Sequence, residues 1–411
     1  MHEAYAEEVL QLAAKTEPPR PLSSLKLICI RVASRHVADI DVDALIGLPV
    51  SLIKDLLPQL SIYDLIRLQP ALNQRGISTQ SAWVLILQDI KGAHRVLDLH
   101  SEDGRIFRVS EVKSLAKSLK QLWQTSRSSL VDLGMAVLPQ SALMALLLDA
   151  CPGLHSLSLE IHPLDVDPGP HGSGMTHEPT YPKELSLRKL SVKVPQVMAD
   201  IHSITAVLKH SPHLTSLHIS GIRLPNSSSH RDLLTSISES NHRLRTLHLE
   251  DLNLADCHQD ILNLLRNCML EELSLKDCRL LERCSDRESY LQQFIDSLKQ
   301  VRSLRSLDLS QNRLAKSAPT LAELFTGSPA SAVKRLDISS NFIQPAELLE
   351  LGQRLQMHPP QQRLTLDLRK NPWDRDRETW HDALQTLRPL CDFQTDGWKS
   401  RNTMADHISN M

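Results

Sequence analysis

A six-residue pattern of apolar positions recurs through the second half of the chain. Aliphatic residues occupy its first, fourth and sixth positions, as in Leu154-His-Ser-Leu157-Ser-Leu159, and polar residues stand between the last two. The pattern starts seven times at intervals of 26 to 34 residues, and a shortened copy closes the series: Leu154, Leu187, Leu214, Leu244, Leu270, Leu304, Val333 and Leu366. Alternation places successive side chains on opposite faces of a strand. Each copy therefore predicts a short strand with its leucines on one side.

Amphipathic helices are predicted between these strands, over 196–210, 258–267, 286–301 and 345–357. Ser285 and Glu288 match a capping box for the third, and Pro345 suits the first turn of the fourth. A strand and a helix at this spacing are typical of leucine-rich repeats. The predicted fold class is α/β: a leucine-rich-repeat solenoid over 92–411, a horseshoe of the ribonuclease-inhibitor-like type.

Three further features complete the predicted solenoid. Weaker strand copies occur at 96–99 and 130–133, with a helix near 110–124 between them, and 162–183 has the composition of a disordered insertion. The third position after the last strand leucine favours Asn or Cys, whose side chain can satisfy turn backbone groups between repeats. It is occupied by such residues in the C-terminal repeats and by aliphatic residues in two earlier ones: Cys278, Asn312, Asn341 and Asn371, against Ile222 and Leu252.

Residues 1–91 contain no repeat and are predicted to be helical. Three leucines at i, i+4 and i+8 form one helical stripe: Leu52, Leu56 and Leu60. Ser61-x-x-Asp64 predicts the start of a second helix, and a third is predicted over 78–89. Three short helices are too small for a core of their own. We therefore expect them to pack on the solenoid or on a partner.

The stretch Ser51-Leu52-x-x-x-Leu56-x-x-x-Leu60 resembles the BC box of Elongin-binding substrate receptors, in which a small residue and a leucine are followed by a cysteine and an aliphatic residue. Here Leu56 replaces the cysteine, and Pro58 predicts a kink before Leu60. The resemblance implies that these four residues bind Elongin B–Elongin C, with the first leucine in a pocket of Elongin C. It also implies a substrate-recognition subunit of a cullin-2 or cullin-5 RING ubiquitin ligase. A Leu-Pro-x-Pro cullin-5 box is absent downstream, which leaves the cullin open.

Two alternatives remain for this N-terminal adaptor-docking segment. It also resembles an F-box, which begins Leu-Pro and ends Asp-Leu-x-Arg-Leu, as Leu48-Pro49 and 64–68 do here. That resemblance implies a cullin-1 ligase. The other alternative is a non-ligase leucine-rich-repeat interaction scaffold, in which these helices only cap the first repeat. Exposure of Leu52 and Leu56 in the free chain would separate docking from capping.

Composition narrows the partners and the location. The net charge is −2 and aromatic residues make up 3% of the chain, which argues against nucleic acid as the main partner. Seven cysteines without a C-x-x-C pair suit a reducing interior. The acidic start over 1–8 is unlike a signal peptide, and no apolar run approaches the ~20 residues of a membrane span. We therefore expect a cytoplasmic and nuclear protein with no membrane partner.

Catalytic and metal-binding motifs are absent from the sequence. It contains no nucleophile elbow, no His-Glu-x-x-His and no phosphate-binding loop. The spacing of His202, His210, His213 and His218 fits no tetrahedral ligand set. We expect no catalytic residue, metal or cofactor, and any ubiquitin transfer would be carried out by a recruited RING subunit.

The polar position between the last two strand apolars predicts the target surface. Aligned from repeat to repeat at ~4.8 Å, these residues form one row on the concave face: Ser158, Ser191, His218, His248, Ser274, Asp308, Asp337 and Asp367. Three adjacent carboxylates repel one another unless a positive group lies over them. We predict that Asp308, Asp337 and Asp367 bind a basic segment of an unknown protein substrate, with His218 and His248 at the other end of the groove. The alternative is local neutralisation by arginines on the same strands: Arg305, Arg335 and Arg369.

Overall fold

The chain forms two compact units in a computed structural model, residues 1–89 and 90–411. The structure describes residues 25–79, 81–83, 96–99, 107, 109–126, 130–161, 184–198, 201–224, 227–327 and 330–396. The repeat pattern predicts a boundary after residue 91, two residues from the boundary between the units. The predicted insertion at 162–183 lies outside the described residues.

The first unit is helical wherever it has regular structure in its described residues. Its elements are α2 (Leu25–Arg35), η1 (Val37–Asp39), α3 (Val42–Ile46), α4 (Val50–Leu56), η2 (Leu57–Gln59) and α5 (Ile62–Gln74). The Ser61 hydroxyl accepts a hydrogen bond from the Asp64 backbone N–H at 3.1 Å, the cap predicted for α5. Leu65, Leu68 and Leu72, spaced at i, i+3 and i+7 along α5, share one face of the helix and are buried. Of the helix predicted over 78–89, residues 81–83 are helical, whereas 78 and 79 are described and not helical, so the predicted start at residue 78 is wrong.

Helix α4 is shorter than the leucine stripe predicts. It ends at Leu56, a 3-10 turn follows, and Leu60 has extended backbone with φ −74° and ψ 146°. Pro58 accounts for the break, because proline has no N–H to continue the helical hydrogen bonds. The prediction of a single helical stripe through Leu60 is therefore wrong.

The second unit contains an 11-stranded parallel sheet whose strands lie in sequence order. The strands are β1 (Val96–Leu99), β2 (Asp132–Met135), β3 (Ser156–Glu160), β4 (Lys189–Met198), β5 (Ser216–Arg223), β6 (Thr246–Glu250), β7 (Glu272–Ser274), β8 (Ser306–Asp308), β9 (Arg335–Asp337), β10 (Leu364–Asp367) and β11 (Cys391–Gln394). The two weak N-terminal copies form β1 and β2. Strand β11 was not predicted, because Cys-Asp-Phe-Gln lacks the repeating leucines.

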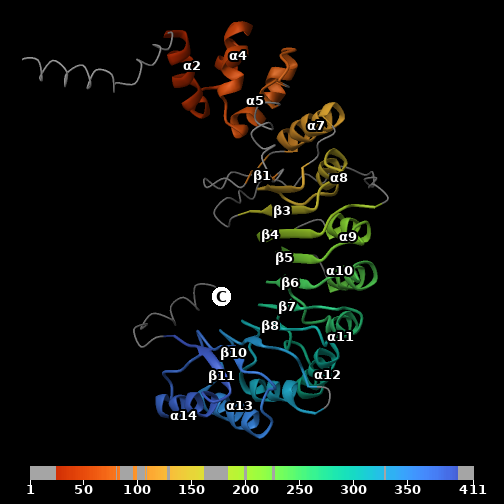
Figure 1. Ribbon diagram of the computed structural model, residues 1–411, viewed down its shortest axis with the longest axis vertical. Helices are drawn as coiled ribbons and strands as arrows, with labels where there is room; N and C mark the ends of the chain where they lie inside the picture. The colour runs from red at the N-terminus through yellow and green to blue at the C-terminus, as the bar shows by residue number, and fades with distance from the viewer. Residues whose placement is uncertain are drawn as a thin grey trace, which may run out of the picture. The chain divides into compact units, whose positions relative to one another are not determined.

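Among the described residues, helical segments follow every strand from β1 to β10 except β3, and they lie along one side of the sheet (Figure 1), each packed against the next. They are α7 (Val109–Ser126), α8 (Ser141–Ala150), α9 (Ile201–Lys209), α10 (Ser227–Ser240), α11 (His258–Arg266), α12 (Arg287–Gln300), η4 (Ala315–Phe325), α13 (Pro345–Met357) and α14 (Arg377–Leu387). The predicted α/β leucine-rich-repeat solenoid is confirmed. Two details differ: α9 starts at Ile201 because β4 runs to Met198, and Asp286, not Ser285, caps α12 by accepting from Ser289 N–H at 3.0 Å.

The core of the second unit lies between the sheet and the helices. Strand residues alternate between buried leucines and half-exposed polar residues, as in β3, β5 and β6. The leucines therefore face the helices, and the polar residues face away from them on the open side of the sheet. This alternation places the predicted row of polar positions on the open face.

A ladder of buried amide side chains links the C-terminal repeats. The Asn312 side-chain oxygen accepts from the backbone N–H groups of Cys278 and Leu280, and its amide donates to the Leu275 carbonyl at 2.7 Å. Asn341 makes the same type of contacts to the repeat of Asn312, and Asn371 makes them to the repeat of Asn341. The Cys278 thiol donates to the Leu249 carbonyl at 2.9 Å. The predicted satisfaction of turn backbone groups between repeats is confirmed.

Candidate functional site

The four residues of the BC-box-like stretch divide between surface and interior. Ser51 is exposed and Leu52 is 37% exposed, whereas Leu56 is 4% and Leu60 6% exposed. In the free chain only the first two can meet a partner without a change in the first unit. Adaptor binding by these four residues stays a prediction.

Additional apolar side chains are exposed beside Leu52. Leu48 and Val50 are 37% and 41% exposed, so three large aliphatic residues within five positions of the chain meet solvent. We call Leu48, Val50 and Leu52 the α4 patch. Analysis of the sequence did not single out Val50, because it belongs to no leucine stripe. Its position in the first turn of α4, before that helix packs against the rest of its unit, accounts for its exposure.

The predicted row on the open face of the sheet is formed by the strand register. His218 lies opposite His248, His248 opposite Ser274, and Ser274 opposite Asp308. Asp308 pairs with Asp337, and Asp337 with Asp367. The residues selected from the repeat pattern are therefore neighbours. Their role in substrate binding stays a prediction.

Each carboxylate of the row uses one oxygen to hold the turn after its own strand. Asp308 accepts from Ser310 N–H at 2.8 Å, Asp337 from Ser339 N–H at 2.9 Å, and Asp367 from Arg369 N–H at 3.1 Å. This repeated local bond gives the aspartates a structural role in addition to any binding role.

Among the three carboxylates of the row, only the last one, Asp367, is paired with a basic side chain in the described residues. The Arg369 guanidinium lies 2.5 Å from an Asp367 carboxylate oxygen. Arg305 instead donates to the backbone carbonyls of Arg302 and Leu304. In the part of the chain that the structure describes, neither Asp308 nor Asp337 has a basic side chain within ion-pair distance. Local neutralisation by arginine therefore accounts for Asp367 and not for the other two carboxylates.

Asp337 lies between the other two carboxylates of the row, Asp308 and Asp367, and its pKa is shifted. Burial raises the pKa of Asp337 above its ordinary value, the hydrogen bonds from Ser339 lower it, and the charges of Asp308 and Asp367 raise it again, so that the net shift is upward. A cation over Asp337 would relieve this repulsion, because it would favour the charged form of the carboxyl.

The histidine end of the row gathers acidic side chains. His218 Nε2 lies 3.5 Å from one Glu250 carboxylate oxygen, and His248 Nδ1 lies 3.8 Å from the other. On the opposite side of the His248 ring, Nε2 is 3.3 Å from Glu272 Oε1. Analysis of the sequence missed both glutamates. Glu250 could have been found, since it follows His248 by two residues and so shares its face of the strand.

Glu250 is held in its charged form. Burial raises the pKa of Glu250, but the contact with His218 and the electrostatic interactions with His218, Lys276 and His248 outweigh burial, so the pKa lies below its ordinary value. The Ser274 hydroxyl lies 3.3 Å from a Glu250 oxygen and 3.0 Å from Asp308 Oδ2. One hydroxyl has a single proton, so it serves only one of these carboxylates at a time.

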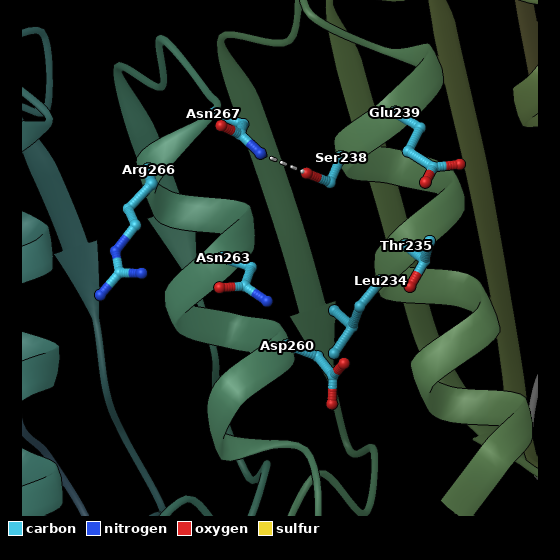
Figure 2. Close-up of a pocket in the computed structure, with 8 residues that line it drawn as sticks. All are labelled: Leu234, Thr235, Ser238, Glu239, Asp260, Asn263, Arg266 and Asn267. Carbon is cyan, nitrogen blue, oxygen red and sulfur yellow. Dashed lines mark hydrogen bonds between the residues drawn. The ribbon is translucent and has the colours of Figure 1, made fainter.

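A groove of about 350 Å³ lies on the helical side of the sheet, between α10 and α11. Figure 2 shows its polar lining, including the hydrogen bond from the Asn267 amide to the Ser238 hydroxyl at 3.2 Å. The lining carries both signs of charge, with Glu239 and Asp260 against Arg266, and holds no cysteine or histidine. The groove has the hydroxyls of Thr235 and Ser238 but no histidine among its lining residues to act as their base.

Burial lowers the reactivity of the cysteines that lie inside the second unit. Burial raises the pKa of the Cys151 thiol to about 12 and of Cys268 to about 11. Such thiols are protonated near neutral pH and are poor nucleophiles.

In the described ranges, no helix combines the length and the apolar character needed to span a bilayer.

The stacked parallel strands, the helices on one side and the asparagine ladder define a leucine-rich-repeat protein. No protein-family model matches the chain. It is 32% identical to leucine-rich repeat-containing protein 41 of Bos taurus over 282 residues, which is 67% of this chain and 34% of the relative. It is 31% identical to the Homo sapiens protein of the same name over 281 residues, again 67% and 34%.

The chain is thus a homologue of leucine-rich repeat-containing protein 41, and it spans about a third of the length of the curated relatives it matches. Among solved structures, the leucine-rich repeat-containing protein LegL7 from Legionella pneumophila aligns with 66% of this chain and 95% of its own. The sequence identity is 17% and the TM-score 0.33.

Proposed function

We propose that the chain is the substrate-recognition subunit of an Elongin BC–cullin-2 or cullin-5 RING ubiquitin ligase, which promotes ubiquitination and degradation of a bound target. In this proposal the first unit binds Elongin C through the α4 patch, and the open face of the sheet holds the target. The observation that carries the proposal is the exposure of Leu52 within a stretch that resembles a BC box. The chain itself is not the enzyme.

Exposure of Leu52 is what docking into a pocket requires. Burying one leucine that solvent reaches is worth ~1.5–3 kcal/mol when it is fully exposed beforehand. Because Leu52 is 37% exposed, burying the rest of its side chain contributes correspondingly less, ~0.6–1.1 kcal/mol. Leu56 and Leu60 support the surface from inside the unit. A substitution at Leu56 would therefore confuse loss of docking with loss of folding.

The adaptor test uses Leu52 alone. We expect Leu52→Ala to reduce co-purification of Elongin B–Elongin C with the full chain by about threefold to sixfold, which corresponds to ~0.6–1.1 kcal/mol. Leu146→Ala is the matched control, because Leu146 on α8 is also 37% exposed and lies in the other unit. Elongin C recovery at the wild-type level from the Leu52 variant would exclude the BC-box role.

An F-box role in a cullin-1 ligase is the second candidate. Leu48 and Pro49, which open the F-box-like pattern, are both exposed. The same purification distinguishes the two, since recovery of a Skp-type adaptor in place of Elongin C would assign the α4 patch to cullin-1. Recovery of neither adaptor would favour the non-ligase scaffold.

The target is proposed to present a basic segment to the carboxylate row. Asp308 and Asp337 have no basic side chain within ion-pair distance among the described residues. Burial is the main cause that raises the pKa of Asp337, and the charges of Asp308 and Asp367 add to that rise. A complementary positive segment would be attracted at long range, so association should be fast and sensitive to salt.

The target test neutralises the row without changing its shape. Asparagine keeps the side-chain oxygen that accepts from the turn N–H, so the triple change Asp308→Asn, Asp337→Asn and Asp367→Asn should fold. A matched control changes three exposed aspartates on helices: Asp232, Asp296 and Asp382. We expect target recovery after proteasome inhibition to fall in the row variant only, with Elongin binding unchanged. Equal recovery from both triple variants would remove the row from target binding.

A further inference from the structure

Two histidines and a glutamate converge on the open face of the sheet. His218 on β5 is directly opposite His248 on β6, and Glu250 follows on β6 at the next position of the same face. The three side chains are half-buried, at 22%, 24% and 22% exposed. One ligand-type atom from each lies within 4.8 Å of the other two. We propose that His218, His248 and Glu250 bind a divalent transition-metal ion, with Zn²⁺ as the expected occupant.

The separations are close to those of a tetrahedral zinc site. Zinc–nitrogen and zinc–oxygen distances of about 2.0–2.2 Å place neighbouring ligand atoms about 3.4 Å apart. His218 Nε2 is 3.5 Å and His248 Nδ1 is 3.8 Å from the Glu250 carboxylate oxygens. The two distances run to different Glu250 oxygens, so side chains must rotate for one ion to bind all three residues, while the strand register holds the backbones in place.

The hydrogen bonding of the two imidazole rings is compatible with a bound metal. His218 Nε2 and His248 Nε2 are buried atoms without a well-aligned hydrogen bond among the described residues, although Glu250 lies 3.5 Å from the first and Glu272 lies 3.3 Å from the second. Buried polar atoms are rarely left without partners. A metal bound by His218 Nε2 would use that lone pair, and a metal bound by His248 Nδ1 would leave Nε2–H free to turn towards Glu272, which lies 3.3 Å away.

Supporting contacts surround the three ligands. Metal-binding histidines commonly donate their other N–H to a carboxylate, which fixes the orientation of the ring. Glu272 stands in that place for His248, and the Ser274 hydroxyl lies 3.3 Å from the Glu250 carboxylate. The charge balance also favours a cation, because Glu250, Glu272 and Asp308 gather around the two imidazoles and Ser274.

The donor set selects the class of metal. Two imidazoles and one carboxylate suit zinc and its neighbours, whereas Mg²⁺ and Ca²⁺ prefer oxygen ligands alone. Three protein ligands leave a fourth position for water or for a group from a bound target. The site is independent of the proposed adaptor role, since every residue involved belongs to the second unit.

Zn²⁺ binding to the full chain tests the site. The protein is purified without a histidine tag, stripped with EDTA and titrated with Zn²⁺ against a fluorescent competing chelator, with Mg²⁺ as the negative control. We expect one saturable Zn²⁺ per chain and a rise in the unfolding temperature. The site should be lost in His218→Gln, His248→Gln and the near-isosteric Glu250→Gln, and weakened about tenfold in Glu272→Gln.

His213→Gln is the matched control, because His213 pairs with Glu184 at 2.7 Å without a third ligand. Its affinity for Zn²⁺ should equal that of the wild type. Circular dichroism verifies that each variant is folded. Absence of a saturable site, or equal affinity in the His218 and His213 variants, would overturn the proposal. Replacement by Co²⁺ adds a spectroscopic readout: a sulfur-to-metal charge-transfer band would assign the ion to cysteines and overturn it as well.

Discussion

Replacing Asn341 by alanine tests whether the asparagine ladder holds the C-terminal repeats together. Asn341 is fully buried. Its side-chain oxygen accepts from Asn312 N–H at 2.8 Å and Leu314 N–H at 3.2 Å. Its amide donates to the Leu309 carbonyl at 2.9 Å and the Ser339 carbonyl at 3.1 Å. Alanine removes all four bonds. The Asn312 and Leu314 N–H groups lose their side-chain acceptor, whereas the Leu309 and Ser339 carbonyls each keep another donor, the Asn312 amide and the Gln311 N–H.

The expected loss follows from that count. A net contribution of about 1 kcal/mol for each hydrogen bond gives a loss of about 4 kcal/mol in the free energy of unfolding. This is a large fraction of the stability of a typical domain. Asn263→Ala is the matched control, because Asn263 is exposed on α11 and hydrogen-bonds only to Gln259 in the described part of the chain. Its effect should stay within about 0.5 kcal/mol.

Urea unfolding and amide hydrogen exchange measure the effect and its location. Repeats interact mainly with their neighbours, so the Asn341 variant should lose protection first in β8, β9 and β10, and less in β3 to β5. A loss below about 1 kcal/mol would refute the assignment of the ladder as a main source of stability. Equal loss of protection along the whole sheet would refute the local, repeat-to-repeat account.

The remaining predictions concern charge, packing and thiol reactivity. Between the ordinary Asp pKa of 3.8 and the raised pKa of Asp337 in the folded chain, the folded chain binds more protons at Asp337 than the unfolded chain, so stability falls as pH rises through this window. Asp337→Asn should therefore raise the unfolding temperature at pH 7 and weaken the dependence of stability on pH. A clear decrease in the unfolding temperature at pH 7 would contradict this account. Leu56→Ala should destabilise the first unit by ~2–5 kcal/mol, measured by hydrogen exchange in α5. Leu52→Ala should cost less than ~1 kcal/mol, because Leu52 is partly exposed. Equal losses in the two variants would contradict the burial of Leu56. A thiol reagent followed by mass spectrometry should modify exposed Cys29 in the folded chain and buried Cys278 only after unfolding, since burial raises the pKa of Cys278 well above its ordinary value; early labelling of Cys278 would contradict its burial.

The repeating part of the structure could be predicted because its physics is local and periodic. Alternation of leucine with polar residues specifies a strand and the face of each side chain. Repetition at a nearly constant interval then brings equivalent positions side by side, so that His218 meets His248 and Asp308 meets Asp337 although about 30 residues separate each pair. The ladder asparagines follow from the same register. Ser61 as the cap of α5 follows from a short-range pattern alone.

Contacts that depend on side-chain direction or on packing between elements were not available from that periodicity. The burial of Leu56 but not Leu52 depends on how α4 packs within its unit. The approach of Glu272 to His248 joins diagonal neighbours on two strands, and pairwise register does not show which way a long side chain turns. Arg305 donates to backbone carbonyls while Arg369 pairs with Asp367, although both arginines lie near a row carboxylate. Long, flexible side chains choose among several nearby partners, and only the folded surroundings determine which partner is within reach.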